Sequence, residues 1–243
     1  LSASLVLLCC VAAQSGIRSI AISSGILLPF VVVFGDFVMS ANLPKKNYSL
    51  LTPVMEHGVE PVLKGCMYVG GGLVELIIIL LFQHRMKSNI RPWSLCLLAI
   101  FLVILVFGPV TGAIAAFGPF EAAKLRYPAY EEWRLVQVGK YIRHVDFLSI
   151  YQWLSGAFVR ISIALLLLID LLPASQNKNM RLIWLTILGI VMVFLVELPI
   201  SDMQYASFLK HVYLPLSLGI VVGVSLLLFI AVLVKNKTGV SRQ

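Results

Sequence analysis

Two charged side chains, Glu75 and Arg160, lie deep inside long apolar segments of this sequence. A charge at the centre of a bilayer costs about 2.5–3.5 kcal/mol on insertion scales, and such residues usually face a cavity or a partner. Glu75 could bind a ligand or a proton, or it could form a structural pair with Arg160 or Lys64. Arg160 cannot lose its proton, so the role of a fixed counter-ion or anion anchor suits it better than that of a proton relay.

Three consecutive glycines, Gly70–Gly72, precede Glu75. By their i, i+3, i+4, i+7 spacing, Tyr68, Gly71, Gly72 and Glu75 share one helix face. Adjacent glycines weaken a helix and allow another backbone or a ligand to come close. In transporters, broken helices at mid-membrane bind substrate through such backbone groups, whereas small residues also suit tight helix packing. The residue types leave both roles open. The candidate ligand-binding residues of this segment are Tyr68, Gly70, Gly71, Gly72 and Glu75.

A later apolar segment places Trp153, Gly156 and Arg160 on one helix face, and these residues complete the predicted ligand-binding set. The other acidic residues of the apolar segments lie nearer to the ends of predicted helices. Snorkelling and capping explain most residues of that kind, so we give them little functional weight. They are Asp36, Asp170, Glu197 and Asp202.

Nothing in the sequence indicates catalysis, a metal site or a cofactor. The metalloprotease, nucleophile-elbow, phosphate-loop and dinucleotide-binding motifs are all missing. The four histidines fall in predicted loops or at helix ends without metal-ligand spacing, and the four cysteines lie in apolar segments without a Cys-x-x-Cys pair. The net charge of +8 comes from loops and ends and forms no basic stripe, so we expect no nucleic-acid partner.

The composition predicts an all-α integral membrane protein. The chain is 60% hydrophobic and 12% charged, with a mean hydropathy of +0.96, whereas soluble domains carry roughly 25% charged residues. A spanning helix needs about 20 apolar residues, and the sequence supplies about seven such segments within one transmembrane domain, 1–243. The predicted spans are 1–13, 20–42, 62–82, 93–117, 147–171, 181–200 and 210–234. The first is too short for a full span, so we expect the chain to enter part-way through a helix.

The loops between the predicted spans sort onto two faces. Each face carries nine Lys and Arg, but the loops of the face with the C-terminus are shorter and contain no acid, which favours that face as cytoplasmic. The long connection 118–146 belongs to the other face. Apolar and basic residues recur at helical spacing over 130–143, which predicts an amphipathic helix at the interface. It could be a simple connector or a lid over an aqueous cavity.

Three stretches of the sequence stand out by their order and spacing: Gly16–Pro29, Leu51–Gly65, and the run Phe117–Glu121 followed by Tyr127–Pro128 and Ile142–Asp146. Together they resemble the B subunit of bacterial spore germinant receptors, the spore germination permease family of the amino acid–polyamine–organocation superfamily. The resemblance implies ten helices in two inverted five-helix repeats. The seven spans are then helices four to ten, and the first three are absent.

The same resemblance implies positions and roles for the segments described above. The helix with Gly70–Gly72 becomes the sixth, which in this superfamily is unwound where ligand binds. The connection 118–146 becomes the external segment between helices seven and eight, and the C-terminus becomes cytoplasmic. The missing first helix would complete the ligand site, so we expect this fragment alone neither to bind nor to transport.

The function implied by the resemblance is a nutrient germinant receptor subunit without enzymatic activity. It would recognise a small molecule such as an amino acid between helices one, six and eight, in the spore inner membrane or the bacterial cell membrane. It would then signal to an A-type subunit and a C-type lipoprotein subunit. Two alternatives stay open. One is a proton-coupled amino acid permease in which Glu75 titrates, and the other is a membrane scaffold subunit whose ligand site is vestigial.

Overall fold

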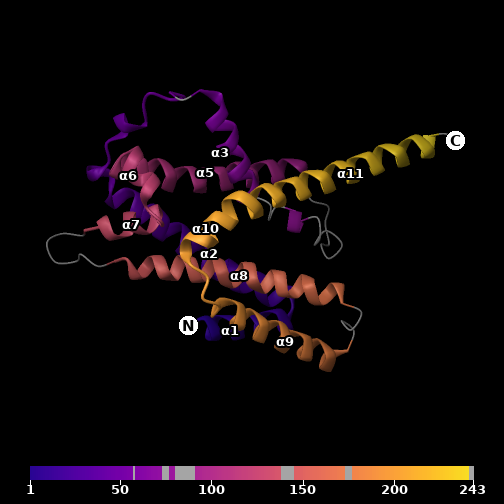
Figure 1. Cartoon of the computed structure of the whole chain (residues 1–243). Coiled ribbons are helices and arrows are strands. Elements are labelled where there is room, and N and C mark those ends of the chain that lie inside the picture. Colours follow the sequence, from indigo (N-terminus) through magenta and orange to yellow (C-terminus); the bar gives the residue numbers. More distant parts are fainter. Residues whose placement is uncertain (57, 73–76, 80–90, 138–144, 173–176, 241–243) are drawn as a thin grey trace. The chain divides into compact units, whose positions relative to one another are not determined.

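The computed structural model describes residues 1–56, 58–72, 77–79, 91–137, 145–172 and 177–240 (Figure 1). All regular secondary structure in these ranges is helical, and no strand occurs among them. The predicted all-α class is therefore confirmed. The described part of the chain divides into two compact units.

The first unit comprises Leu1–Thr52 and Phe101–Leu198. It contains most of α5, which spans Pro92–Phe117. Its other helices are α1 Ser2–Ser15, α2 Ile17–Ala41, η1 Leu43–Lys45, η2 Tyr48–Leu51, α6 Pro119–Lys124, α7 Pro128–Leu135, α8 Phe147–Leu171 and α9 Lys178–Val196.

The second unit comprises Pro53–Ile100 and Pro199–Gln243 and includes the beginning of α5. Its other helices are α3 Val59–Gly72, α10 Asp202–Phe208, the π-helical turn η6 Leu209–Tyr213, and α11 Leu214–Val240. Ser201 caps α10 in a capping box with Gln204, so the start of this helical run is fixed by its own side chains.

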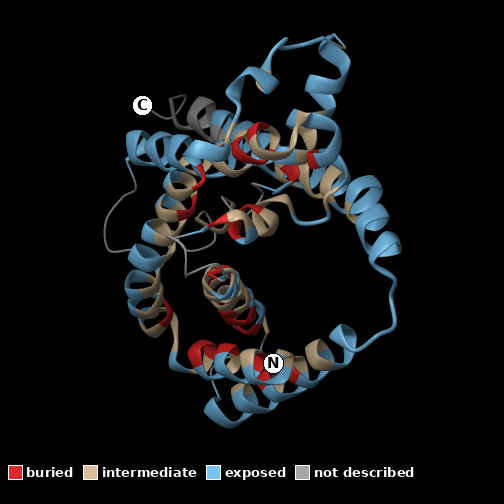
Figure 2. Cartoon of the chain, turned by 90° about the vertical axis from the view of Figure 1, so that its left-hand side faces the viewer, coloured by how far each residue is buried: buried red, intermediate tan, exposed pale blue. Residues whose placement is uncertain are grey.

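Five of the described helices are long and apolar enough to cross a membrane, and α1 is a shorter apolar helix. At most 28% of the apolar window of any of the five is buried, so most of their side chains are left for lipid or further helices. Figure 2 shows buried residues confined to short stretches, with exposed and intermediate residues along the rest of the ribbons. The arrangement of seven spans stays a prediction, because part of the segment 62–82 lies outside the described residues.

Two glycines with positive φ separate consecutive helices in the first unit. Gly16, at φ 89°, lies between α1 and α2, and Gly118, at φ 82°, lies between α5 and α6. A residue with a Cβ atom is strained in this conformation, whereas glycine is not. Pro119 and Pro128 then occupy the first turns of α6 and α7, where a missing N–H costs nothing.

The helix α1 packs against α8 and α9 (Figure 1). Cys9 and Ala13 are fully buried, and the Cys9 thiol points at the Phe158 carbonyl with Sγ 3.7 Å from the oxygen. On α9, a Cβ atom added to Gly189 would lie 3.2 Å from the Sγ atom of Cys10. These contacts hold α1, α8 and α9 together. All four cysteines of the chain are free thiols.

The connection 118–146 differs from its predicted form. We expected one helix over 130–143, but α7 begins at Pro128 and ends at Leu135, and Val136 and Gln137 are not helical. The prediction is wrong at this end because Val136 turns inward and is fully buried. It packs in a cluster with Val38, Trp133 and Val145, and this burial outweighs the weak helix preference of valine. Residues 138–144 lie outside the described ranges.

Candidate functional site

The glycine run on α3 lies where this helix packs against α11 in the second unit. Gly71 is buried, and a Cβ atom added there would lie only 2.4 Å from the carbonyl oxygen of Leu214. Ser217 Oγ lies 3.4 Å from the Gly71 carbonyl oxygen and 3.0 Å from that of Leu214, and it donates to both. The two backbones thus meet at Gly71, which is the small-residue packing that the sequence left open.

The other two glycines have more space around them. A Cβ atom at Gly70 would lie 3.2 Å from Leu218 Cδ1, and one at Gly72 would meet no atom within 4 Å. Tyr68 on the same helix is partly buried. Only Gly71 is thus required by packing, and ligand binding at this segment stays a prediction.

Glu75 lies outside the described residues, so none of its suggested roles is tested. Lys64, one of its suggested partners, forms an exposed ion pair with Glu60 one turn earlier on α3, with Nζ 2.7 Å from Oε1. Among the described residues, no three His, Cys, Asp or Glu side chains gather closely enough to hold a metal ion.

Trp153 on α8 belongs to an aromatic cluster with Tyr127 and Tyr130, in the first unit. Its ring centroid lies 5.5 Å from that of Tyr127 and 5.9 Å from that of Tyr130. The hydroxyl of Tyr130 donates to Asp146 Oδ2 over 3.2 Å, and this bond to a carboxylate is the main reason why the pKa of Tyr130 is raised. The guanidinium of Arg126 lies 4.9 Å from the centroid of the Tyr127 ring. The cluster ties the start of α7 to α8.

Gly156 and Arg160 follow Trp153 along α8, and all three are exposed. A Cβ atom at Gly156 would meet nothing within 4 Å, so this side of the helix has free space. The predicted α8 residues therefore share one helix face, which is open at Gly156. The predicted α3 residues belong to the other unit.

The first unit also contains a buried ion pair that the sequence analysis missed. Lys46 follows η1 and reaches Glu132 on α7, with Nζ 2.8 Å from Oε2 and side-chain exposures of 0% and 2%. Asn42, at the end of α2, donates from Nδ2 to the Glu132 carbonyl oxygen over 2.7 Å. Burial raises the pKa of Glu132, although Lys46 opposes that change. No sequence pattern links positions 46 and 132, and we had counted Lys46 only as a loop cation.

Gly112 on α5 makes room for this pair. A Cβ atom added there would lie 2.6 Å from Lys46 Nζ and 2.7 Å from Glu132 Oε2. One turn earlier, a Cβ atom at Gly108 would make only an ordinary contact of 3.5 Å with Met39.

We expect Gly112→Ala to lower the thermal midpoint of the detergent-solubilised protein, because the added methyl group must push the two charged groups apart. Overpacking of this kind costs about 1–3 kcal/mol. Gly108→Ala is the matched control, since it adds the same atom to the same helix and should raise or preserve the midpoint. Equal midpoints for the two variants would contradict this account of Gly112.

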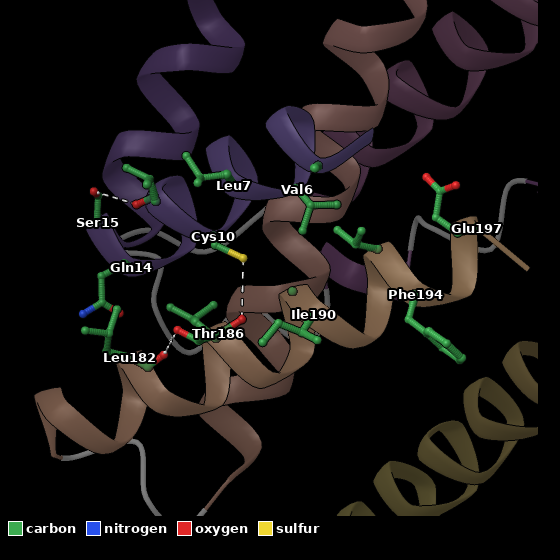
Figure 3. Close-up of a pocket in the computed structure, with 15 residues that line it drawn as sticks. Val6, Leu7, Cys10, Gln14, Ser15, Leu182, Thr186, Ile190, Phe194 and Glu197 are labelled. Carbon is green, nitrogen blue, oxygen red and sulfur yellow. Dashed lines mark hydrogen bonds between the residues drawn. The ribbon is translucent and has the colours of Figure 1, made fainter. Parts of the chain in front are cut away.

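An apolar groove of about 790 Å³ runs between α1 and α9 in the same unit (Figure 3). Side chains such as Leu7, Ile190 and Phe194 line it, with Gln14 beside Leu182 at one end and Glu197 at the other. Its lining is almost entirely hydrocarbon, so it offers shape but few polar partners to a small polar ligand.

Comparison with known proteins identifies relatives of this chain. The model of a family described as spore germination protein matches residues 1–204. Spore germination protein XB of Bacillus anthracis is 50% identical over 225 residues, which are 92% of this chain and 63% of that protein. The chain thus spans less than two thirds of this relative's length. No solved structure matches the chain. The resemblance indicated by the three sequence stretches is confirmed.

Proposed function

Because this chain belongs to the spore germination protein family, we propose that it is part of a membrane receptor subunit that recognises a nutrient germinant. The family match over residues 1–204 carries the proposal. The chain is an integral membrane protein with five long apolar helices among its described residues. We place it in the spore inner membrane with its C-terminus in the cytoplasm, as the short basic loops favour.

The germinant would be an amino acid or a similar small molecule. Arg160 would anchor its carboxylate through charge-assisted hydrogen bonds, Trp153 would contact its apolar part, and the glycine segment of α3 would offer close backbone approach. The proposed binding residues are Tyr68, Gly70, Gly71, Gly72, Glu75, Trp153, Gly156 and Arg160. The free space at Gly156 and the shared face of the α8 residues support this assignment.

Signalling requires that the germinant bind one conformation of the subunit better than another, because only differential affinity shifts an equilibrium. Partner subunits of the A and C types would then respond to the favoured conformation. The relative is longer than the matched region. In the full-length protein, the segment that corresponds to the rest of the relative would supply the remaining helices, including the one that completes the site. No enzymatic step enters this proposal.

The proposed site predicts a selective effect of filling the space at Gly156. In the full-length protein, Gly156→Leu should raise the germinant concentration for half-maximal germination by about tenfold or more, which corresponds to a loss of about 1.4 kcal/mol of binding free energy. Gly25→Leu is the control, because Gly25 is also an exposed helical glycine without neighbours within 4 Å but lies on α2. An unchanged dose–response curve for Gly156→Leu, at normal protein level, would overturn the α8 site.

A proton-coupled amino acid permease is the second candidate function, because Glu75 is a titratable group inside an apolar segment. Uptake of labelled amino acids into proteoliposomes separates the two functions. The receptor proposal expects no accumulation when a pH gradient is imposed. Strong pH-driven uptake that is lost in Glu75→Gln would favour the permease instead.

A further inference from the structure

The buried pair Lys46–Glu132 belongs to a larger set of contacts that fixes α7. The segment from Asn42 to Lys46 reaches this helix three times. Besides the ion pair and the bond from Asn42, the ammonium of Lys45 donates to the carbonyl oxygen of Leu135. Carbonyl groups in the last turn of a helix have no partner within the helix. Asn42 and Lys45 supply donors to two such carbonyl groups, those of Glu132 and Leu135. The segment from Asn42 to Lys46 therefore holds the C-terminal half of α7 in place through three polar contacts.

The opposite half of α7 holds the ring of Trp153. Tyr127 caps the helix and Tyr130 lies in its first turn, and their rings are the ones that contact Trp153, at 5.5 and 5.9 Å. Trp153 is otherwise 47% exposed, so these two tyrosines restrict its orientation. A helix of eight residues is only about 12 Å long. A displacement at Glu132 must therefore move Tyr130, which precedes it by two residues.

We propose that Lys46 and Glu132 are positioning residues for Trp153, acting through α7. The ion pair sets the place of α7 against α2 and α5, and α7 in turn sets the orientation of the Trp153 ring on α8. This inference rests on the proposed function only in that Trp153 is one of the proposed germinant-binding residues. The positioning itself is a property of the first unit and can be measured without a germinant.

The burial of the pair explains why it can position a helix, whereas a surface pair could not. A surface ion pair contributes little to stability and leaves both side chains mobile. Here both side chains are enclosed, and the backbone of Gly112 lies against both charged groups. The ammonium and the carboxylate can move apart only if α7 moves or if one of the two groups is removed.

Fluorine NMR of the chain labelled with fluorotryptophan tests this inference, because the sequence contains only four tryptophans. The Trp153 signal is assigned with Trp153→Phe. In Lys46→Met and in Glu132→Gln, the signals of Trp153 and of Trp133, which adjoins Glu132, should shift by more than a line width. The signals of Trp93 and Trp184 should stay in place. Lys124→Met, at the exposed pair Lys124–Glu121, should leave all four unchanged.

The same spectra distinguish positioning from a merely structural role. If the pair only stabilises the fold, then all four signals broaden together or none moves, and either result overturns the inference. The double variant Lys46→Met with Glu132→Leu restores an uncharged, filled site, so the Trp153 signal should return toward its original position. A signal that stays displaced in the double variant would contradict the proposed link through α7.

Germination assays then address the connection to function. In the full-length protein, the single variants should raise the half-maximal germinant concentration several-fold and leave the maximal rate unchanged, since they alter binding geometry only. Unshifted dose–response curves together with a displaced Trp153 signal would support the positioning and remove Trp153 from the proposed germinant site. Unshifted curves together with an unmoved signal would overturn the positioning itself.

Discussion

Replacing Glu132 by Ala should lower the free energy of unfolding by about 3–5 kcal/mol, which is a large loss for one substitution. The change leaves the ammonium of Lys46 enclosed without a counter-charge, since its side chain has no exposed surface. Reversible unfolding in mixed detergent micelles, followed by the circular dichroism of the helices, measures the loss.

The exposed pair Lys124–Glu121 on α6 supplies the control for this prediction. Glu121→Ala should change the unfolding free energy by no more than about 1 kcal/mol, because both partners stay hydrated. The double variant Lys46→Met with Glu132→Leu should recover most of the loss, since apolar residues of similar size often replace a buried pair without cost. Similar losses in Glu132→Ala and Glu121→Ala would show that the burial of the first pair has no energetic consequence.

Alanine substitutions at Gly71 and Gly72 should have opposite effects, although the two glycines are neighbours on α3. At Gly71 the new Cβ atom would overlap the Leu214 carbonyl group, which belongs to a helix backbone and cannot rotate away. We expect a loss of about 1–3 kcal/mol or more, with separation of α3 from α11. At Gly72 nothing lies within 4 Å, and alanine should stabilise the helix by about 0.5–1 kcal/mol.

Thermal midpoints of the two glycine variants, measured side by side, decide this point. A cysteine pair placed across α3 and α11 gives a second readout, because cross-linking should fall in Gly71→Ala and persist in Gly72→Ala. If both substitutions are tolerated equally, then the close approach of α3 to α11 at Gly71 is not required for stability.

Apolar patterns along the chain were sufficient to predict the fold class, whereas the family was indicated by the resemblance of three sequence stretches. A spanning helix satisfies all its backbone groups internally, so a long apolar run indicates such a helix without any knowledge of its neighbours. The helical spacing of residues 130–143, which is also a local pattern, did not predict correctly where α7 ends. There, the burial of Val136 depends on Val38, which lies almost 100 positions earlier in the sequence.

The candidate site was predicted only in part, for the same physical reason. Spacing alone placed Trp153, Gly156 and Arg160 on one helix face, because helical geometry is local. The role of Gly71 depends on a partner helix that begins at Leu214, and the pair Lys46–Glu132 depends on a loop and a helix that no periodicity relates. Contacts of this kind follow from the packing of the whole unit.

In the proposed function, the full-length protein binds a nutrient through the face of α8 that carries Trp153, Gly156 and Arg160. Equilibrium binding of labelled amino acids to the purified full-length protein in nanodiscs tests it most directly. We predict saturable binding of at least one amino acid by the unmodified protein and by Gly25→Leu, and its loss in Gly156→Leu. Binding that survives unchanged in Gly156→Leu, or no binding of any amino acid at millimolar concentration, would contradict the account.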